Sequence, residues 1–195
     1  MKLTVIGASG HGRVVASIAE LNGYDEIVFL DDDPSLRFCG VYPVIGPTDA
    51  PCDGDCFVAI GSAEARERLS RGRKTVTLIH PNAVIARGVV IGSGTVVMPG
   101  TVVCTGTVIG SGCIVNTSSS VDHDCRLGDY VHVAVGAHLC GTVSVGSRTW
   151  IGAGATVINN IGICEGCVIG AGAVVIRDVT EPGTYVGVPA RLLNK

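Results

Sequence analysis

The residues with the clearest capacity for chemistry are a histidine and an acid that follow one another in the sequence, His123 and Asp124. A neutral imidazole can take a proton from an attacking nucleophile, and a neighbouring carboxylate can orient the ring and stabilise its protonated form. The pair is therefore a candidate general base with its orienting acid. Because a single surface histidine usually has no catalytic role, this interpretation depends on where the fold places the pair.

The other histidines and the cysteines do not make a convincing metal site. His132 and His138 are six residues apart, and Cys164 and Cys167 form one CxxC pair, which cannot complete a tetrahedral zinc site by itself. The chain has nine cysteines without the spacing of a disulfide framework. We expect no metal, small thiols that fill space in the interior, and the reducing environment of the cytoplasm.

A glycine-rich turn near the N-terminus could hold phosphates. Residues 7–12 read Gly-Ala-Ser-Gly-His-Gly between an apolar segment and a helical pattern, and Asp31 follows 19 residues after Gly12. Backbone N–H groups at such a helix start can bind the phosphates of a dinucleotide or of a nucleotide sugar. Since about 78 residues make only half of a dinucleotide-binding fold, we favour a nucleotide sugar over NAD.

The elements that position this turn alternate between strands and helices. Such an order predicts a small parallel sheet, a half-Rossmann-like α/β domain over residues 1–78. The predicted strands are residues 3–6, 27–30, 57–61 and 76–79, and the predicted helices are residues 14–21 and 62–71.

Beyond residue 79 a six-residue period replaces this order. Starting at Ile85, every sixth residue up to Val175 is Ile, Leu or Val, sixteen in succession, and small residues and glycines recur between them. This is the hexapeptide repeat of a parallel β-helix, in which three repeats make one triangular coil of 18 residues. We therefore assign residues 79–195 to a β-helix with Leu127 buried between Ile109 and Val145.

The repeat also places the chemistry. His123 comes two residues after the inward Val121, so it should lie at a turn between two faces of the coil. No residues are inserted in the register between Ile85 and Val175, so the β-helix has no loop to cover a substrate. The N-terminal domain is then the part available to hold the acceptor.

Composition excludes several classes of function. With 14 Lys and Arg against 17 Asp and Glu, the net charge of −3 leaves no basic footprint for nucleic acid. No apolar run reaches the length of a membrane span.

The two halves together resemble the sugar O-acyltransferase family of hexapeptide-repeat acyltransferases, which includes sialic acid O-acetyltransferases and nucleotide-amino-sugar N-acetyltransferases. Within it the chain looks most like the UDP-4-amino-sugar N-acetyltransferases of bacillosamine synthesis. The resemblance covers essentially the whole chain. Its segments are IGASGHG (6–12), FLDD (29–32), AIG (59–61), IHP (79–81), NTSSSVDHDC (116–125), HVAVGA (132–137) and GVPAR (187–191).

The resemblance implies a left-handed β-helix, a homotrimer with an acetyl-CoA cleft between adjacent helices, and direct acetyl transfer to a sugar amine. It implies His123 as general base with Asp124, although other members carry Glu at position 124. The implied nucleotide-sugar residues are Ser9, Gly10, His11, Asp31, Asp32 and Gly61, and the implied acetyl-CoA residues are His132, Gly141, Ala153 and Ala171.

Three alternative functions stay open at this point. The nearest is O-acetylation of a sialic acid or related sugar, because a histidine base serves a hydroxyl as well as an amine. A non-catalytic nucleotide-sugar sensor and an NAD-binding oxidoreductase belong to other classes. The residues also leave open the choice among UDP, GDP and CMP.

Overall fold

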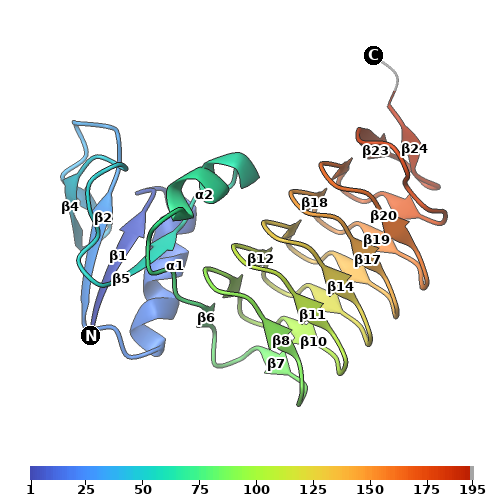
Figure 1. The fold of residues 1–195 in the computed structure, drawn as a ribbon, viewed down its shortest axis with the longest axis horizontal. Coiled ribbons are helices and arrows are strands. Elements are labelled where there is room, and N and C mark those ends of the chain that lie inside the picture. Colours follow the sequence, from blue (N-terminus) through green and yellow to red (C-terminus); the bar gives the residue numbers. More distant parts are fainter. Residues whose placement is uncertain (194–195) are drawn as a thin grey trace.

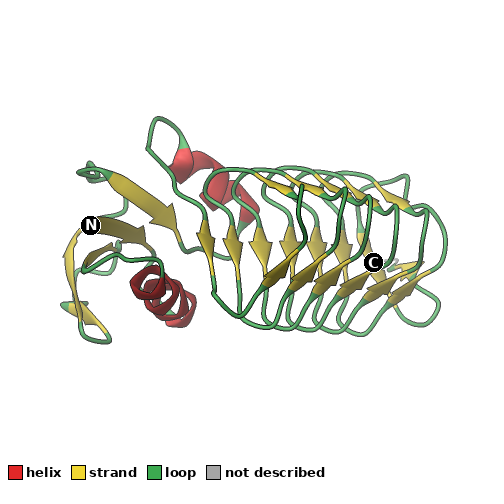
Figure 2. Ribbon diagram, turned by 90° about the horizontal axis from the view of Figure 1, so that it is seen from below, coloured by secondary structure: helices red, strands yellow, loops and turns green. Residues whose placement is uncertain are grey.

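The structure is a computed structural model that describes residues 1–193. It has two parts, a small α/β unit and a long parallel β-helix (Figures 1 and 2). The α/β unit sits at the N-terminal end of the β-helix, and its two helices lie toward the first coils. Among the described residues, no helix is long and apolar enough to cross a membrane.

The N-terminal unit is a five-stranded sheet with the strand order β3-β4-β2-β1-β5. The strands β2, β1 and β5 are parallel, as predicted, and β4 also pairs parallel with β2, whereas β3 pairs antiparallel with β4 in a hairpin that we did not predict. The elements are β1 Lys2–Ile6, α1 Gly10–Leu21, β2 Glu26–Leu30, β3 Phe38–Cys39, β4 Tyr42–Gly46, β5 Asp55–Val58 and α2 Ala63–Ser70.

The β-helix consists of three sheets, which we call the domain-facing sheet, the second sheet and the third sheet. Their strands are parallel and two residues long, except that β23 has three residues and pairs antiparallel with β24. The domain-facing sheet holds β6 Leu78–Ile79, β9 Val96–Val97, β12 Ile114–Val115, β15 His132–Val133, β18 Trp150–Ile151, β21 Val168–Ile169, β23 Thr184–Val186 and β24 Arg191–Leu192. The second sheet holds β7 Val84–Ile85, β10 Val102–Val103, β13 Ser120–Val121, β16 His138–Leu139, β19 Thr156–Val157 and β22 Val174–Val175. The third sheet holds β8 Val90–Ile91, β11 Val108–Ile109, β14 Arg126–Leu127, β17 Ser144–Val145 and β20 Gly162–Ile163.

The predicted six-residue register is confirmed. From β7 to β22 paired strands are 18 residues apart, so Leu127 stacks between Ile109 and Val145 and is 4% exposed. Fourteen of the sixteen repeat positions belong to one continuous buried core, and Ile85 and Ile91 pack against it from the first coils. The small residues predicted near the corners, such as Thr107 and Cys125, are also buried.

The outward face of the domain-facing sheet joins the two parts. Its first three outward side chains, Leu78, Val96 and Ile114, are buried in the same cluster as Val15 and Ile18 of α1. The predicted strand over residues 76–79 is therefore shorter and belongs to the β-helix, because Leu78 pairs with Val96 and not with the N-terminal sheet. The division after residue 78 falls inside β6 and stays a prediction.

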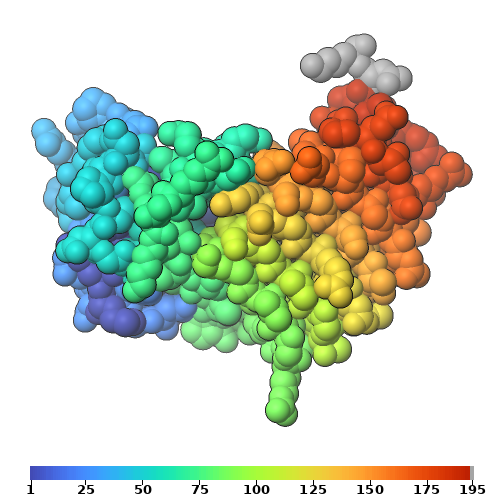
Figure 3. Space-filling model, in the orientation of Figure 1, coloured from blue at the N-terminus to red at the C-terminus, as the bar shows by residue number. Residues whose placement is uncertain are grey.

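The N-terminal unit covers only the first coils. Beyond Ile114, the outward positions of the same sheet are His132, Trp150 and Val168, and exposure rises along this row until Trp150 is half exposed. The space-filling view shows the later coils free of the N-terminal unit on this side (Figure 3). A row of side chains thus runs from beneath the N-terminal unit into the open.

Candidate active site

His123 and Asp124 lie in the turn between β13 and β14, at a corner of the coil. Their Nδ1 and Oδ2 atoms are 2.8 Å apart, and the side chains are 54% and 63% exposed. Thr107, one coil earlier, holds the turn from inside: its hydroxyl donates to the Asp122 carbonyl at 2.7 Å and accepts from Cys125 N–H at 3.2 Å. The pair is thus presented to solvent on a fixed turn.

The electrostatics of this corner favour a basic imidazole. The hydrogen bond with Asp124 raises the pKa of His123, and the nearby charge of Asp122 raises it further. The Asp122 carboxylate also accepts the backbone N–H of His123 at 2.7 Å. With Nδ1 donating to Asp124, we assign the free lone pair to Nε2, which makes Nε2 the atom able to accept a proton.

Gly141 lies one coil further along, directly under the imidazole. A Cβ at this position would come within 2.5 Å of Nε2 of His123, so a larger residue here would displace the ring from this position. Its peptide is held in place because Thr142 N–H donates to the His123 carbonyl at 2.9 Å and Asn160 N–H donates to the Gly141 carbonyl at 3.0 Å. Within residues 1–193 no group accepts the Gly141 N–H.

His132 lies on a different face, in the outward row of the domain-facing sheet. Its ring stacks on Trp150 with the ring centroids 5.4 Å apart and the planes 3° from parallel. Asn116, one coil earlier, is 3.2 Å away through Nδ2 and Nε2. Burial, followed by the charge of Arg66, lowers the pKa of His132 to about 4, so this ring is neutral at pH 7.

Ala153 and Ala171 occupy another corner, between the domain-facing sheet and the second sheet. They follow β18 and β21 on successive coils, where Gly172 N–H donates to the Ala153 carbonyl at 2.8 Å. His123 and Gly141 lie at the corner on the opposite side of the second sheet. A single chain therefore does not gather all the residues that the resemblance assigns to acetyl-CoA around His123.

The predicted nucleotide-sugar residues gather at the carboxyl ends of β1, β2 and β5. A Cβ at Gly12 would come within 2.2 Å of the Gly7 carbonyl oxygen, which explains the tight glycine turn before α1. The Asp31 carboxylate accepts the Ala8 N–H at 2.7 Å, and the Asp32 carboxylate accepts the backbone N–H and the hydroxyl of Thr48 at 2.8 and 3.0 Å. The two acids therefore hold the loops at this edge.

His11 belongs to the same edge, in the first turn of α1. Burial, followed by the charge of Arg66, lowers the pKa of His11 to about 4. Its Nε2 is buried, and within residues 1–193 it has no hydrogen-bond partner.

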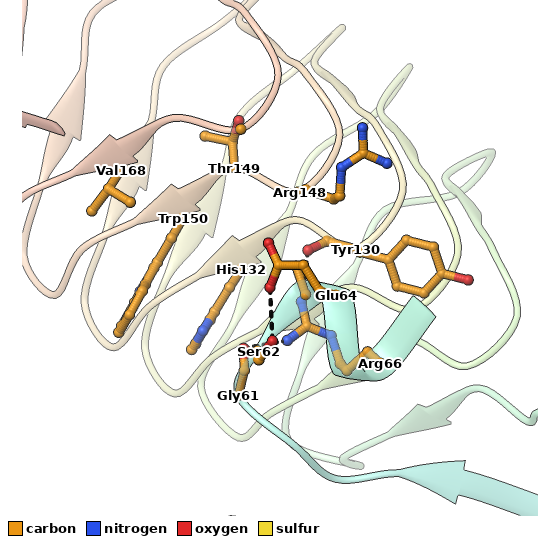
Figure 4. Close-up of a pocket in the computed structure, with 12 residues that line it drawn as sticks. Gly61, Ser62, Glu64, Arg66, Tyr130, His132, Arg148, Thr149, Trp150 and Val168 are labelled. Carbon is orange, nitrogen blue, oxygen red and sulfur yellow. Dashed lines mark hydrogen bonds between the residues drawn. The ribbon is translucent and has the colours of Figure 1, made fainter. Parts of the chain in front are cut away.

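A pocket of about 520 Å³ lies between the start of α2 and the outward row of the β-helix. On one side are Gly61, Glu64 and Arg66, and on the other are the edges of His132 and Trp150 (Figure 4). The pocket thus begins at Gly61, one of the predicted nucleotide-sugar residues, and reaches His132, one of the predicted acetyl-CoA residues.

Sequence reasoning missed Arg66, Trp150 and Asn116 as parts of this region. Arg66 resembles any arginine on a polar helix, and its burial depends on the docking of α2 onto the β-helix. Trp150 did carry a signal, since a tryptophan in the outward position next to that of His132 on the same sheet predicts ring stacking. Asn116 belongs to the segment that carried the resemblance, but it had no assigned role.

The cysteines are free thiols, and Cys113, Cys125 and Cys167 are fully buried as predicted. From the repeat, Cys164 follows the inward Ile163 and is expected to point away from Cys167, which takes an inward position. This expectation is wrong, because the two sulfur atoms are 3.4 Å apart across the turn. Cys164 packs against the core from its edge. In the described part of the chain, no group of three or more His, Cys, Asp or Glu side chains is arranged to hold a metal ion.

Comparison with known proteins adds three kinds of match. The family described as the PglD N-terminal domain matches residues 2–72. The GDP-perosamine N-acetyltransferase of Escherichia coli O157:H7 is 32% identical over 163 residues, which are 76% of this chain and 74% of that protein. The acetyltransferase domain of PglB from Neisseria gonorrhoeae, solved with acetyl coenzyme A, is 42% identical with a TM-score of 0.93 over 98% of both chains. PerB from Caulobacter crescentus, solved with CoA and GDP-perosamine, is 36% identical with a TM-score of 0.92 over 100% of this chain and 98% of that one.

Proposed function

This chain belongs to the hexapeptide-repeat family of sugar N-acetyltransferases, and from that premise we propose that it transfers the acetyl group of acetyl-CoA to the 4-amino group of a UDP-linked amino-deoxy sugar. The relatives act on nucleotide-linked amino sugars by name, and one of them is a UDP-N-acetylbacillosamine N-acetyltransferase from Bacillus subtilis, 34% identical over 105 residues. The observation that carries the proposal for this chain is the His123 corner.

We assign the general base to Nε2 of His123. The neutral amine attacks the thioester carbonyl carbon, and a C–N bond forms as the carbonyl π electrons move to oxygen. Nε2 takes the proton that the nitrogen loses, while Asp124 stabilises the resulting imidazolium through Nδ1. The tetrahedral intermediate then collapses, the C–S bond breaks, and the CoA thiolate leaves and is protonated.

The Gly141 N–H is our candidate for stabilising the oxyanion. A preorganised backbone donor at the position of the developing charge is among the strongest contributions to acyl transfer. This N–H has no partner in the described chain, and Gly141 lies under the ring of the proposed base. The donor and the base would then face the same carbonyl.

The acceptor is assigned to the N-terminal unit. The uninterrupted coil has no covering loop, and the glycine turn with Ser9, Gly10 and His11 lies at the same sheet edge as Asp31, Asp32 and Gly61. An edge of this kind, at the carboxyl ends of parallel strands and before a helix, suits the phosphates of a nucleotide sugar.

The donor is assigned to a cleft between two copies of the chain in a homotrimer. His123 and Gly141 lie at one corner of the coil, whereas Ala153 and Ala171 lie at another, so a neighbouring copy must bring the second set to the first. The outward valines Val84, Val90 and Val102 are exposed on the second and third sheets of the early coils, and this exposed apolar surface supports an assembly that would bury them between copies.

We place the enzyme in the cytoplasm, where acetyl-CoA is available. All nine cysteines are free thiols, including the adjacent Cys164 and Cys167, which a reducing compartment would keep so.

Product analysis by mass spectrometry tests this function directly. The purified protein is incubated with acetyl-CoA and one acceptor in each of several parallel reactions. The acceptors are UDP-linked and GDP-linked 4-amino sugars, CMP-sialic acid and free sialic acid. We expect CoA release together with an N-acetylated UDP-4-amino sugar. Transfer only to the GDP-linked sugar would correct the nucleotide, and acetylation of a sialic acid hydroxyl would replace the function with the O-acetyltransferase alternative. Binding of a nucleotide sugar without transfer would indicate a sensor.

A further inference from the structure

Arg66 is a buried cation that no carboxylate of residues 1–193 contacts directly. It lies in α2, is 1% exposed, and is the largest of the fully buried side chains in the described chain. Its guanidinium donates only to backbone carbonyls, and within residues 1–193 it forms no ion pair. Buried charges in proteins are normally paired, so an unpaired one requires an explanation.

Arg148, which lines the same pocket, is paired with carboxylates as arginines usually are. It is partly exposed and pairs with Glu67 at 3.3 Å and with Glu165 at 3.1 Å. Glu64 also lines the pocket and its charge acts on Arg66, but its carboxylate accepts a hydrogen bond from the Ser62 hydroxyl at 2.7 Å and forms no direct ion pair with Arg66. Burial lowers the pKa of Arg66 to about 10, and the group therefore stays charged at neutral pH.

The carbonyls around Arg66 come from both parts of the molecule. Nη1 donates to Ile60 and Gly61 at 3.1 and 2.6 Å, at the end of β5. Nε donates to Gly112 at 2.8 Å and Nη2 donates to Tyr130 at 2.6 Å, in turns of two successive coils. Arg66 therefore fastens the loop that contains Gly61 to the β-helix.

The charge of Arg66 also reaches the glycine turn. It contributes to the lowered pKa of His11, in the first turn of α1, and to that of His132 across the pocket. Nε2 of His11 is a buried polar atom without a partner in residues 1–193. The Gly61 carbonyl that Arg66 holds follows β5, and His11 follows the neighbouring strand β1, so both groups belong to the edge where the nucleotide sugar is expected.

We propose that Arg66 is a positioning residue for the acceptor, and that the diphosphate of the bound nucleotide sugar neutralises its buried charge. This inference rests on the proposed function. Because carbonyls already engage Nε and both terminal nitrogens, the guanidinium acts on the diphosphate mainly through its charge, which is effective over several ångströms where water is excluded. It also holds Gly61 in place.

Calorimetry on the full-length protein tests the charge. In Arg66→Met we expect the Kd of UDP to rise at least about tenfold. Removing one partner of a buried charge pair weakens the affinity of a complex by about this factor or more. The Kd of uridine, measured by competition, should change by no more than about threefold, because the nucleoside carries no phosphate. A role confined to structure would weaken UDP and uridine alike, and that result would overturn the proposal.

Further variants separate charge from folding. Arg66→Lys keeps the charge and should bind UDP more tightly than Arg66→Met. Arg66→Gln can still donate a hydrogen bond to a carbonyl but has no charge, so its affinity for UDP should fall as far as that of Arg66→Met. If Arg66→Met does not fold, the comparison of Gln with Lys decides. Arg71→Met is the matched control, since Arg71 follows α2, is exposed and pairs with Glu67 at 3.1 Å.

Titration with acetyl-CoA distinguishes the source of the diphosphate. The affinity for acetyl-CoA should be unchanged in Arg66→Met, and a loss confined to acetyl-CoA would assign the charge to the CoA diphosphate and overturn the proposal. If the wild type binds neither UDP nor GDP and acetylates no nucleotide sugar, the proposed function fails. If the wild type binds UDP and acetylates a nucleotide sugar, and Arg66→Met binds UDP equally well, only this inference fails.

Discussion

At the scale of single residues, the chemistry depends on two short distances at one corner of the coil. The first is the 2.8 Å contact that fixes Nδ1 of His123 on Asp124, and the second is the approach of Nε2 to Gly141, where a Cβ would be 2.5 Å away. Asp is one methylene shorter than the Glu that the resemblance allows at this position, yet the Asp124 carboxylate reaches the ring from a turn residue with a left-handed φ of 58°. The direct contact between histidine and acid is therefore compatible with the shorter side chain.

Replacing His123 with Ala should remove most of the turnover and leave acetyl-CoA binding intact. Loss of a general base costs roughly 10²–10⁴-fold in rate. The exposed side chain makes no core contact, so assembly should not change. Single-turnover rates with saturating substrates check this, and calorimetry with acetyl-CoA is the control. A variant that keeps near-wild-type rates in the chemical step would contradict the assignment of the base.

Replacing Asp124 with Asn should cost less turnover and should also move the pH profile. The hydrogen bond with Asp124 is the largest cause of the raised pKa of His123, so the variant's pKa should be lower. Since the base must be unprotonated, kcat/KM for the wild type should rise with pH through a pKa above the ordinary 6.5, and in Asp124→Asn this limb should lie at lower pH. Both proteins are measured with the same acceptor, so that ionisation of the sugar amine cancels. An unshifted limb would show that the carboxylate does not tune the base.

At the scale of elements, the coil is an array in which each repeat is supported mainly by its two neighbours. This locality explains why the register could be predicted. The inward positions carry Ile, Leu or Val at every sixth residue, and any shift by one residue would turn them outward. The turn of His123 followed from the same register, because it comes two residues after Val121.

Contacts between elements could not be predicted in the same way. The burial of Arg66 needs α2 docked on the turns at Gly112 and Tyr130, which are 46 and 64 residues away in the sequence. The hairpin of β3 and β4 was missed because β3 has only two residues and β4 contains Pro43, which reads as a turn signal. The contact of Cys164 with Cys167 was missed because the repeat sets the facing of strand residues better than that of turn residues.

Replacing Leu127 with Ala should lower both stability and turnover. The side chain is buried between Ile109 and Val145, and a Leu→Ala change in a packed core costs about 2–5 kcal/mol of unfolding free energy through lost transfer energy and a cavity. Its strand directly follows the turn of His123 and Asp124, so the damage should reach the base. Chemical denaturation at a fixed protein concentration and steady-state kinetics measure the two effects.

A matched pair of substitutions separates local from general damage. Val121→Ala and Val175→Ala remove the same atoms from the same sheet, but Val121 has a neighbour on each side while Val175 ends its row. Turnover should fall clearly in Val121→Ala. Val175→Ala should chiefly promote local unfolding of the last coil and affect turnover less. Equal loss of turnover in the two variants would contradict the nearest-neighbour account.

At the scale of the whole molecule, the proposed functional residues are divided among three places. The proposed acceptor edge lies in the N-terminal unit, the proposed base lies at one corner of the β-helix, and Ala153 and Ala171 lie at another. No covering loop brings them together, because the coil is uninterrupted from Ile85 to Val175. Assembly with other copies is the economical way to complete such a site, and the closed symmetry of a trimer would complete it three times.

The central claim, that the catalytic site forms between copies around His123, is tested most directly by mixing two inactive variants. His123→Ala removes the base, and Ala153→Trp fills the proposed acetyl-CoA cleft. The two chains carry different affinity tags, are produced together, and are purified through both tags so that only mixed oligomers remain. If each site takes His123 from one chain and Ala153 from its neighbour, one site in any mixed trimer is intact, and acetyl transfer should return to about a third of the wild-type rate. Activity in the mixed oligomers no greater than that of the two parent variants would show that each site lies within a single chain, and would contradict the account.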